Sequence, residues 1–311
     1  MTEQAIVFDR ALIARRRDRA APLAGAHAFL LERVADDLAE RLQIVRRTFP
    51  VALSLGAYNG TVGGRIRSLD RVGTVVECEL SPRLLAHCRG PRVLADEEAL
   101  PFGDATLDLI VSGLSLQFVN DLPGALVQAR RALKPDGLLL AAVLGGETLS
   151  ELRSVWLEAE AEIEGGVSPR VAPVADVRDL GGLLQRAGFA LPVVDSDIVH
   201  VSYATPLALM QEIKAMGASN ALVERRRTPT RRQTLLRACE IYTDRFSRSD
   251  GRVVATFEIL TLTAWVPHES QQKPLRPGSA TSRLADALGT VEERLPRDDG
   301  RRPSNDEGTA T

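Results

Sequence analysis

Residues 51–60 read VALSLGAYNG, a mostly apolar run followed by a loop with glycine at positions 56 and 60. A short buried strand that ends in such a loop is typical of nucleotide-binding proteins, because glycine lets the backbone turn sharply and approach a ligand. Tyr58 stands between the two glycines, where a third glycine is expected. The loop alone is equally compatible with a plain tight turn, so its meaning depends on the segments around it.

The segments after this loop alternate between apolar runs and helical patterns. We predict five strands, at 51–55, 73–78, 92–95, 107–113 and 138–144. Helical stretches lie between them, and the sequence KPDG (134–137) is interpreted as a turn before the fifth strand. Short strands that alternate with helices indicate βαβ units. The sequence therefore predicts an α/β fold with a doubly wound, Rossmann-like parallel sheet.

The C-terminal half has a different pattern. Segments 197–204 and 253–266 alternate with period two, which predicts a pair of antiparallel strands. Helical segments over about 205–248 predict an insertion between these strands. We accordingly divide the chain into N-terminal helices that form a cap (1–48), an α/β domain (49–266) and an extended, largely disordered tail (267–311).

Composition excludes several classes of protein. The 311 residues carry a net charge of −2, whereas nucleic-acid-binding proteins usually have a strong basic excess. Three cysteines and four histidines show no disulfide framework and no spacing typical of a metal site, so we predict no metal ligands. No apolar run approaches the ~20 residues that span a bilayer. We expect a cytoplasmic location, with peripheral membrane contact at most.

The residues that end the predicted strands are the candidates for ligand binding, because ligands of open α/β sheets bind at the carboxyl ends of the strands. Glu79 ends the second strand, where a carboxylate accepts hydrogen bonds from ribose hydroxyls; a solvated carboxylate is the alternative. Asp96 follows the third strand, where a carboxylate or a neighbouring group meets an adenine. The predicted cofactor-binding residues are Gly56, Tyr58, Gly60, Glu79, Leu80, Asp96, Glu97, Ser112 and Leu114.

The stretch FDRALIARRRDRAA (8–21) is rich in arginine and helical in pattern. A solvated helix face and a membrane-surface or targeting helix are two interpretations. A third is that Arg15, Arg16 and Arg17 close over the cofactor pocket or meet an acidic partner.

Several longer pieces carry a resemblance to a known family. They include DEEALPFGDATLDLIVSGLSLQFVNDLPGAL (96–126) and LKPDGLLLAAVLGGETLSELR (133–153). Over about residues 6–282 the chain resembles the assembly factor 5 family of respiratory complex I, whose members have the class I S-adenosylmethionine-dependent methyltransferase fold. The resemblance implies S-adenosylmethionine as cofactor and hydroxylation of an arginine in the iron–sulfur subunit of complex I. It also implies a location in the bacterial cytoplasm or on the equivalent matrix side of the inner membrane.

The chain departs from this family in the loop itself. Its relatives read LDLGCGRG where this chain reads LSLGAYNG, so Ser54 replaces an acidic residue and Tyr58 replaces a glycine. The first change removes a charged acceptor near the cofactor's ammonium group, and the second adds a ring to the loop. Three functions stay open: an enzyme that modifies a protein side chain, a non-catalytic assembly chaperone, and a methyltransferase for a small molecule or an acyl carrier. No catalytic residue is assigned.

Overall fold

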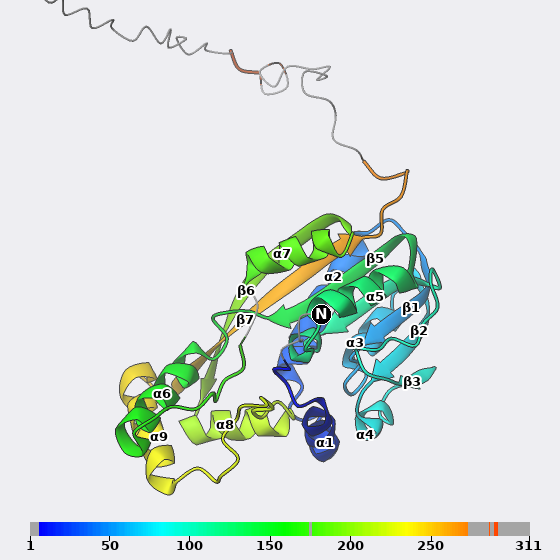
Figure 1. Cartoon of the computed structure of the whole chain (residues 1–311). Helices are drawn as coiled ribbons and strands as arrows, with labels where there is room; N and C mark the ends of the chain where they lie inside the picture. The colour runs from blue at the N-terminus through cyan, green and yellow to red at the C-terminus, as the bar shows by residue number, and fades with distance from the viewer. Residues whose placement is uncertain (1–5, 174–175, 273–285, 287–288, 292–311) are drawn as a thin grey trace, which may run out of the picture. The chain divides into compact units, whose positions relative to one another are not determined.

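A single mixed sheet forms the centre of the protein, in the strand order β3-β2-β1-β4-β5-β7-β6 (Figure 1). The computed structural model describes residues 6–173, 176–272, 286 and 289–291. Strands β1 to β5 are parallel, whereas β7 is antiparallel to both β5 and β6. The strands are β1 Phe49–Leu55, β2 Val72–Glu79, β3 Arg92–Leu94, β4 Leu107–Gly113, β5 Leu133–Leu144, β6 Ala190–Tyr203 and β7 Val253–Trp265.

The strand order reverses between β1 and β4, and this switch point positions the candidate site. On one side of β1 the sheet continues to β2 and β3, and on the other side to β4 and β5. The loops after β1 and β4 therefore leave the same edge of the sheet in opposite directions and open a crevice between them. The order and the antiparallel seventh strand agree with the predicted α/β class.

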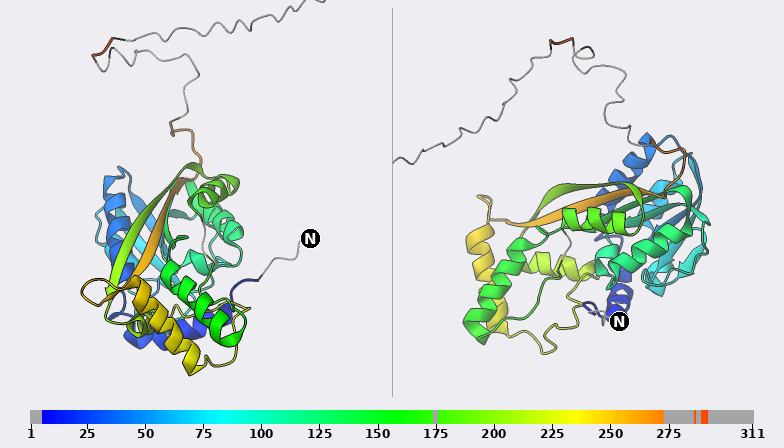
Figure 2. Two further views of the ribbon diagram at one scale, coloured as in Figure 1. Left: turned by 90° about the vertical axis from the view of Figure 1, so that its left-hand side faces the viewer. Right: turned by 45° about the horizontal axis from the view of Figure 1, so that its top comes forward.

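Helices cover both faces of the sheet (Figure 2). Buried residues of α2 and α3 belong to the core on one face, and those of α5 and α7 to the core on the other. The helices are α1 Arg10–Ala20, α2 Phe29–Ile44, α3 Thr61–Arg67, α4 Pro82–Leu85, α5 Leu122–Ala132, α6 Ser150–Glu164, α7 Val177–Arg186, α8 Pro206–Ala215 and α9 Arg232–Phe246, with short 3₁₀ turns η1 Ala21–Leu23 and η2 Leu116–Phe118.

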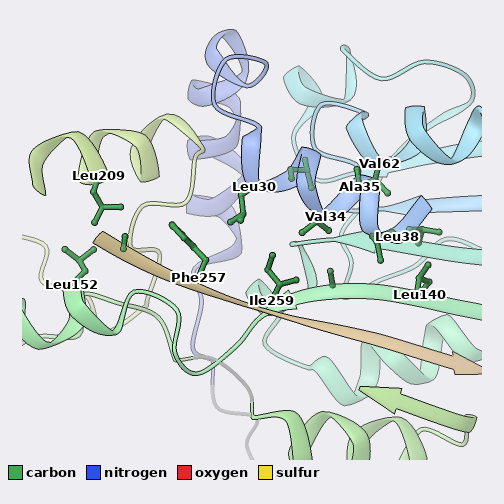
Figure 3. Packing of buried hydrophobic residues seen from close by; sticks show 14 of the residues in the cluster. Leu30, Val34, Ala35, Leu38, Val62, Leu140, Leu152, Leu209, Phe257 and Ile259 are labelled. Carbon is green, nitrogen blue, oxygen red and sulfur yellow. The ribbon is translucent and has the colours of Figure 1, made fainter. Parts of the chain in front are cut away.

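Helix α2 shows how the sequence pattern creates this layer. Its buried positions recur every three or four residues, which places Leu30, Val34 and Leu38 on one face of the helix. Figure 3 shows these side chains directed towards Leu140 of β5 and Ile259 of β7. Full burial of each such side chain stabilises the fold by about 1.5–3 kcal/mol. The helix is thus a structural part of the sheet's core.

The predicted helical insertion over 205–248 is present as α8 and α9. Both gather with α6 at one end of the long β6–β7 pair (Figure 1). Tyr242 of α9 is fully buried, and its hydroxyl donates a hydrogen bond of 2.8 Å to the carbonyl of Val254 in β7. This contact ties the insertion to the sheet.

Two strand boundaries differ from the prediction by more than two residues. Strand β6 begins at Ala190 and not at 197, because it pairs with β7 along almost its whole length, starting with Ala190 opposite Trp265. The KPDG segment was predicted as a turn outside the fifth strand, but it lies within β5, next to a register shift against β4. Asp136 has a φ of 63° there, so the turn-forming residues produce an irregularity inside the strand.

Residues 1–270 form one compact unit, and 271–311 group separately. The finer boundaries after residues 48 and 266 stay a prediction. Most of the predicted disordered tail (273–285, 287–288 and 292–311) lies outside the described residues.

Candidate functional site

The loop after β1 follows the path of a glycine loop although its middle glycine is missing. Gly56 and Gly60 have φ values of 65° and 83°, and Tyr58 between them also has a positive φ, of 53°. A left-handed conformation costs a residue with a side chain roughly 1–2 kcal/mol, so the surroundings must hold Tyr58 in place. They do so through its backbone N–H, which donates a hydrogen bond of 2.9 Å to Glu79 Oε2.

Glu79 at the end of β2 is fully buried and is oriented by the loops on either side. Its Oε2 accepts the N–H of Tyr58, and its Oε1 accepts the N–H of Ser81 at 2.9 Å. Two backbone donors therefore fix the carboxylate beneath the glycine loop. Its place matches the sequence prediction, whereas its burial excludes the alternative of a solvated strand-end carboxylate.

Arg17 of helix α1 is the partner of this carboxylate. Its Nη1 lies 3.0 Å from Glu79 Oε1 and 3.3 Å from Glu97 Oε1, and its Nη2 donates to Ser115 Oγ at 3.3 Å. The guanidinium carbon is 5.9 Å from the centroid of the Phe118 ring. Burial lowers the pKa of Arg17, but the charges of the two glutamates outweigh this effect and raise the pKa overall. Arg17 is therefore charged at every relevant pH.

Arg10, on the same face of α1, contacts the residues after β3. It pairs with Asp96 and Glu97 and donates a hydrogen bond of 3.0 Å to the carbonyl of Phe118. Asp96 and Glu97, predicted to lie near an adenine, are thus joined to Glu79 through two arginines. One interpretation of the sequence had Arg15, Arg16 and Arg17 close over the pocket; of these only Arg17 reaches the carboxylates, and Arg10 was missed. The usable signal was the spacing of Arg10, Ile13 and Arg17, which places the three side chains on one face of a helix but does not identify their partners.

The structure places the remaining predicted residues as follows. Leu114, with a φ of 52°, lines a cavity at this edge of the sheet. Leu80 packs against a small cluster that includes Phe8 and Ile13. Ser112 is buried, and its hydroxyl has no hydrogen-bond partner among the described residues. Gly60 is the N-cap residue of α3 and lies close to Cys88. Neither Ser112 nor Gly60 lines the cavity.

The cavity has a volume of about 200 Å³ and lies between the glycine loop, α1 and the segment after α8. Most of its lining is apolar, including Tyr58, Leu114, Phe118 and Phe257. Arg170 also lines the cavity, but its charge is already paired. Its Nε donates a hydrogen bond of 2.7 Å to Glu160 Oε1, and its guanidinium lies 4.6 Å from the centroid of the Trp156 ring. The cavity can therefore receive a side chain or small group in mostly apolar surroundings.

Ser54, where the family resemblance leads one to expect an acidic residue, lies in register with Glu77 of β2. Glu77 is fully buried and pairs with Arg67 at 2.8 Å. Burial raises the pKa of Glu77, although Arg67 and the Ser54 hydroxyl oppose the shift. A carboxylate is therefore still present beside position 54, one strand away, but it is directed to Arg67.

Two cysteine thiols near the site, those of Cys78 and Cys88, are not activated for reaction. Burial, with nearby carboxylates, raises the pKa of Cys78 and of Cys88 to about 12. Both are therefore protonated near neutral pH, and neither is an activated nucleophile. In the described part of the chain no three His, Cys, Asp or Glu side chains come together as a metal site would require. None of the helices there is both long and apolar enough to cross a membrane.

Acid is expected to weaken the contact between α1 and the sheet. Burial raises the pKa of Glu97, but Arg17, Arg10 and the Ser115 hydroxyl lower it to a net value below the ordinary 4.5. Because the pKa is depressed in the folded state, this stabilisation is complete above about pH 4.5 and is lost as the pH falls through the folded-state value. Urea denaturation between about pH 7 and about pH 3 tests this. Glu97→Gln should be less stable at neutral pH and less sensitive to acid; equal acid sensitivity in both proteins would contradict the assignment.

Comparison with known proteins finds a methyltransferase domain and relatives that match most of the chain. Residues 53–141 match the family model of a methyltransferase domain. The chain is 41% identical to the mitochondrial arginine hydroxylase NDUFAF5 of Danio rerio, covering 90% of this chain and 89% of that protein. It is 39% identical to the Homo sapiens protein of the same name, covering 93% and 85%. A malonyl-[acyl-carrier protein] O-methyltransferase from Halorhodospira halophila is 37% identical, covering 83% and 88%.

Solved structures share the fold at low sequence identity. The YcgJ protein of Bacillus subtilis has a TM-score of 0.52 and 13% identity, covering 74% of this chain and 98% of that one. The protein BH2331 of Bacillus halodurans has a TM-score of 0.53 and 17% identity, covering 75% and 100%. Together with the matched domain and the strand order, these likenesses confirm the predicted class I methyltransferase fold.

Proposed function

Because the chain belongs to the family of the arginine hydroxylase NDUFAF5, we propose that it binds S-adenosylmethionine and modifies an arginine side chain. By resemblance, we place that arginine in the iron–sulfur subunit of complex I during assembly, on the cytoplasmic or matrix side of the membrane. One observation carries the proposal: an apolar cavity opens at the carboxyl edge of the sheet, beside the strand ends of a methyltransferase domain. The relatives' names support the arginine substrate.

The residues at this edge fit the nucleoside part of the cofactor in type and place. Gly56 and Gly60 turn the loop without a Cβ, and a Cβ at Gly56 would lie only 2.0 Å from Ser115 Oγ. Glu79 lies directly under this loop, where its carboxylate would hold ribose hydroxyls. In the structure that carboxylate is bound by Arg17, so the fit requires Arg17 to move. Bound S-adenosylmethionine would supply a sulfonium centre and an activated methyl group. Hydroxylation of an arginine is a two-electron oxidation, so its oxygen atom would have to come from an oxidant outside this chain.

Side chains of this protein would position the substrate. Tyr58, Leu114 and Phe118 exclude water from the cavity and present apolar surface to the aliphatic part of an arginine side chain. Burial raises the pKa of Tyr58 to about 12, although Arg17 opposes the shift. Its hydroxyl therefore stays protonated and donates to the carbonyl of Met216 at 3.2 Å. This bond fixes the ring at the cavity wall.

The test is mass spectrometry of the iron–sulfur subunit of complex I from a strain that lacks this protein. We expect the wild-type subunit to carry one additional oxygen atom on an arginine and the deletion strain to lack it. Expression of the wild-type chain should restore the modification. An arginine with the same mass in both strains would refute the proposed substrate.

A second candidate function is methyl transfer to an acyl-carrier substrate, which the 37% identity to the Halorhodospira halophila enzyme favours. The same deletion strain separates the two functions. Loss of a methyl ester on an acyl-carrier substrate, with the arginine modification intact, would support the second candidate. Purified protein that alters neither substrate and binds no S-adenosylhomocysteine would instead support a non-catalytic assembly chaperone.

A further inference from the structure

Helix α1 covers the carboxylates that the cofactor would need. Arg17 binds Glu79 and Glu97, and Arg10 binds Asp96 and Glu97. The arginines come from one face of a helix that lies far from these strands in the sequence. In Figure 1 this helix lies near α4, at the end of the sheet where the candidate site is found. The cover is therefore part of the protein's own chain.

Glu79 has no acceptor position left in this arrangement. A carboxylate has about four lone-pair positions. Oε1 accepts hydrogen bonds from the N–H of Ser81 at 2.9 Å and from Arg17 Nη1 at 3.0 Å. Oε2 accepts a hydrogen bond from the N–H of Tyr58 at 2.9 Å and lies 3.3 Å from the same Nη1. The two backbone donors belong to the loops that form the site and remain when a ligand binds. Arg17 is the only one of these donors on a separate helix, so it is the one that a pair of ribose hydroxyls must replace.

Tyr58 provides a second contact with the same segment. Its ring packs against Ala21 and Ala24, which follow α1, and against Leu84 of α4. Its hydroxyl binds the carbonyl of Met216 after α8. The residue that replaces the middle glycine of the loop therefore helps to hold the end of α1 over the site.

We propose that α1 is a latch whose Arg17 occupies the ribose subsite, so that nucleoside binding and docking of α1 compete. This inference rests on the proposed binding of S-adenosylmethionine. Helix α1 precedes the core helix α2, and its apolar residues Leu12 and Ile13 belong to a small cluster separate from the two cores of the sheet. Its departure would break the hydrogen bonds of Arg16 and Asp18 to neighbouring segments but would leave both cores intact. When it leaves, Arg17 returns to water and Glu79 becomes available to the ribose. Asp96 and Glu97 are released by the same movement through Arg10.

The first test compares Arg17→Met with Arg15→Met. Both variants remove one positive charge from α1, but Arg15 is exposed and forms no ion pair among the described residues, whereas Arg17 is buried against Glu79. Calorimetric titration with S-adenosylhomocysteine should show at least about tenfold tighter binding for Arg17→Met, because the apparent affinity scales with the fraction of open protein. Arg15→Met should bind like the wild type. Weaker or unchanged binding by Arg17→Met would overturn the latch.

The second test uses the wild-type chain, in case Arg17→Met does not fold. Amide hydrogen exchange over residues 10–20 is measured with and without saturating S-adenosylhomocysteine. The latch predicts faster exchange in α1 when the nucleoside is bound, because the helix leaves its docked position. Slower or unchanged exchange would overturn it. If the latch fails but the nucleoside binds measurably, the proposed function is left intact. That function fails separately if the arginine has the same mass in the wild-type and deletion strains.

Discussion

Glu79→Ala is expected to lower the free energy of unfolding by about 3–5 kcal/mol, which is the range for removing one partner of a buried ion pair. The substitution leaves the Arg17 guanidinium buried with only Glu97 and Ser115, and it also leaves the N–H groups of Tyr58 and Ser81 without their acceptor. Urea denaturation followed by circular dichroism measures the loss. The same variant should lose binding of S-adenosylhomocysteine.

A double-mutant cycle with Arg17→Met separates the ion pair from the rest of the effect. If the pair dominates, Glu79→Ala should cost much less in the Arg17→Met background, because no buried charge is then left without a partner. Additive costs in the two backgrounds would show that Glu79 acts mainly through its backbone hydrogen bonds. A cost below about 1 kcal/mol for Glu79→Ala, the range of an exposed pair, would contradict the buried arrangement.

Gly56→Ala is the second substitution for which we expect a large effect. Its φ of 65° costs an alanine about 1–2 kcal/mol, and its new Cβ would lie 2.2 Å from the Cβ of Ser115. Crowding of this kind adds about 1–3 kcal/mol, because the backbone and its neighbours must shift. Thermal or urea denaturation measures the sum, and nucleoside binding should fall because the loop moves.

Two controls accompany this variant. Gly64→Ala, in helix α3, has open space around its Cβ and should be neutral or slightly stabilising. Ser115→Gly, added to Gly56→Ala, should recover the crowding part of the cost when measured against Ser115→Gly alone, but not the part due to φ. A Gly56→Ala protein as stable as the wild type would mean that the loop follows another path.

Tyr58 stands in the glycine loop where a third glycine is expected, so the path of the backbone there shows what the replacement does. A tyrosine between two glycines predicts a blocked cofactor loop, yet the backbone keeps left-handed conformations at positions 56, 58 and 60. The strain at Tyr58 is balanced by the N–H bond to Glu79, the hydroxyl bond to Met216 and the packing of its ring. The loop thus has a positive φ at all three positions, and the tyrosine side chain makes contacts that glycine cannot make.

The local pattern of the sequence determined the fold class and most of the strand positions. Apolar runs of strand length between helical patterns have few alternatives to a parallel sheet, and the strand at 107–113 was predicted with its observed bounds. Because carboxyl ends of parallel strands share one edge, the sequence also located Glu79, Asp96 and Glu97 near one another. Longer matching pieces identified the family, which relatives at 41% and 39% identity confirm.

Only the tertiary structure decided which groups pair with the carboxylates of the site. A pattern cannot reveal that Arg10 and Arg17 of the first helix neutralise carboxylates at positions 79, 96 and 97, because these contacts join residues far apart in the chain. The same holds for β6, whose first residues lack a clear alternation and become a strand by pairing with β7. Local sequence specifies periodicity and turn chemistry, whereas the choice of partner for a buried charge or a strand edge depends on which surfaces the folded chain brings together.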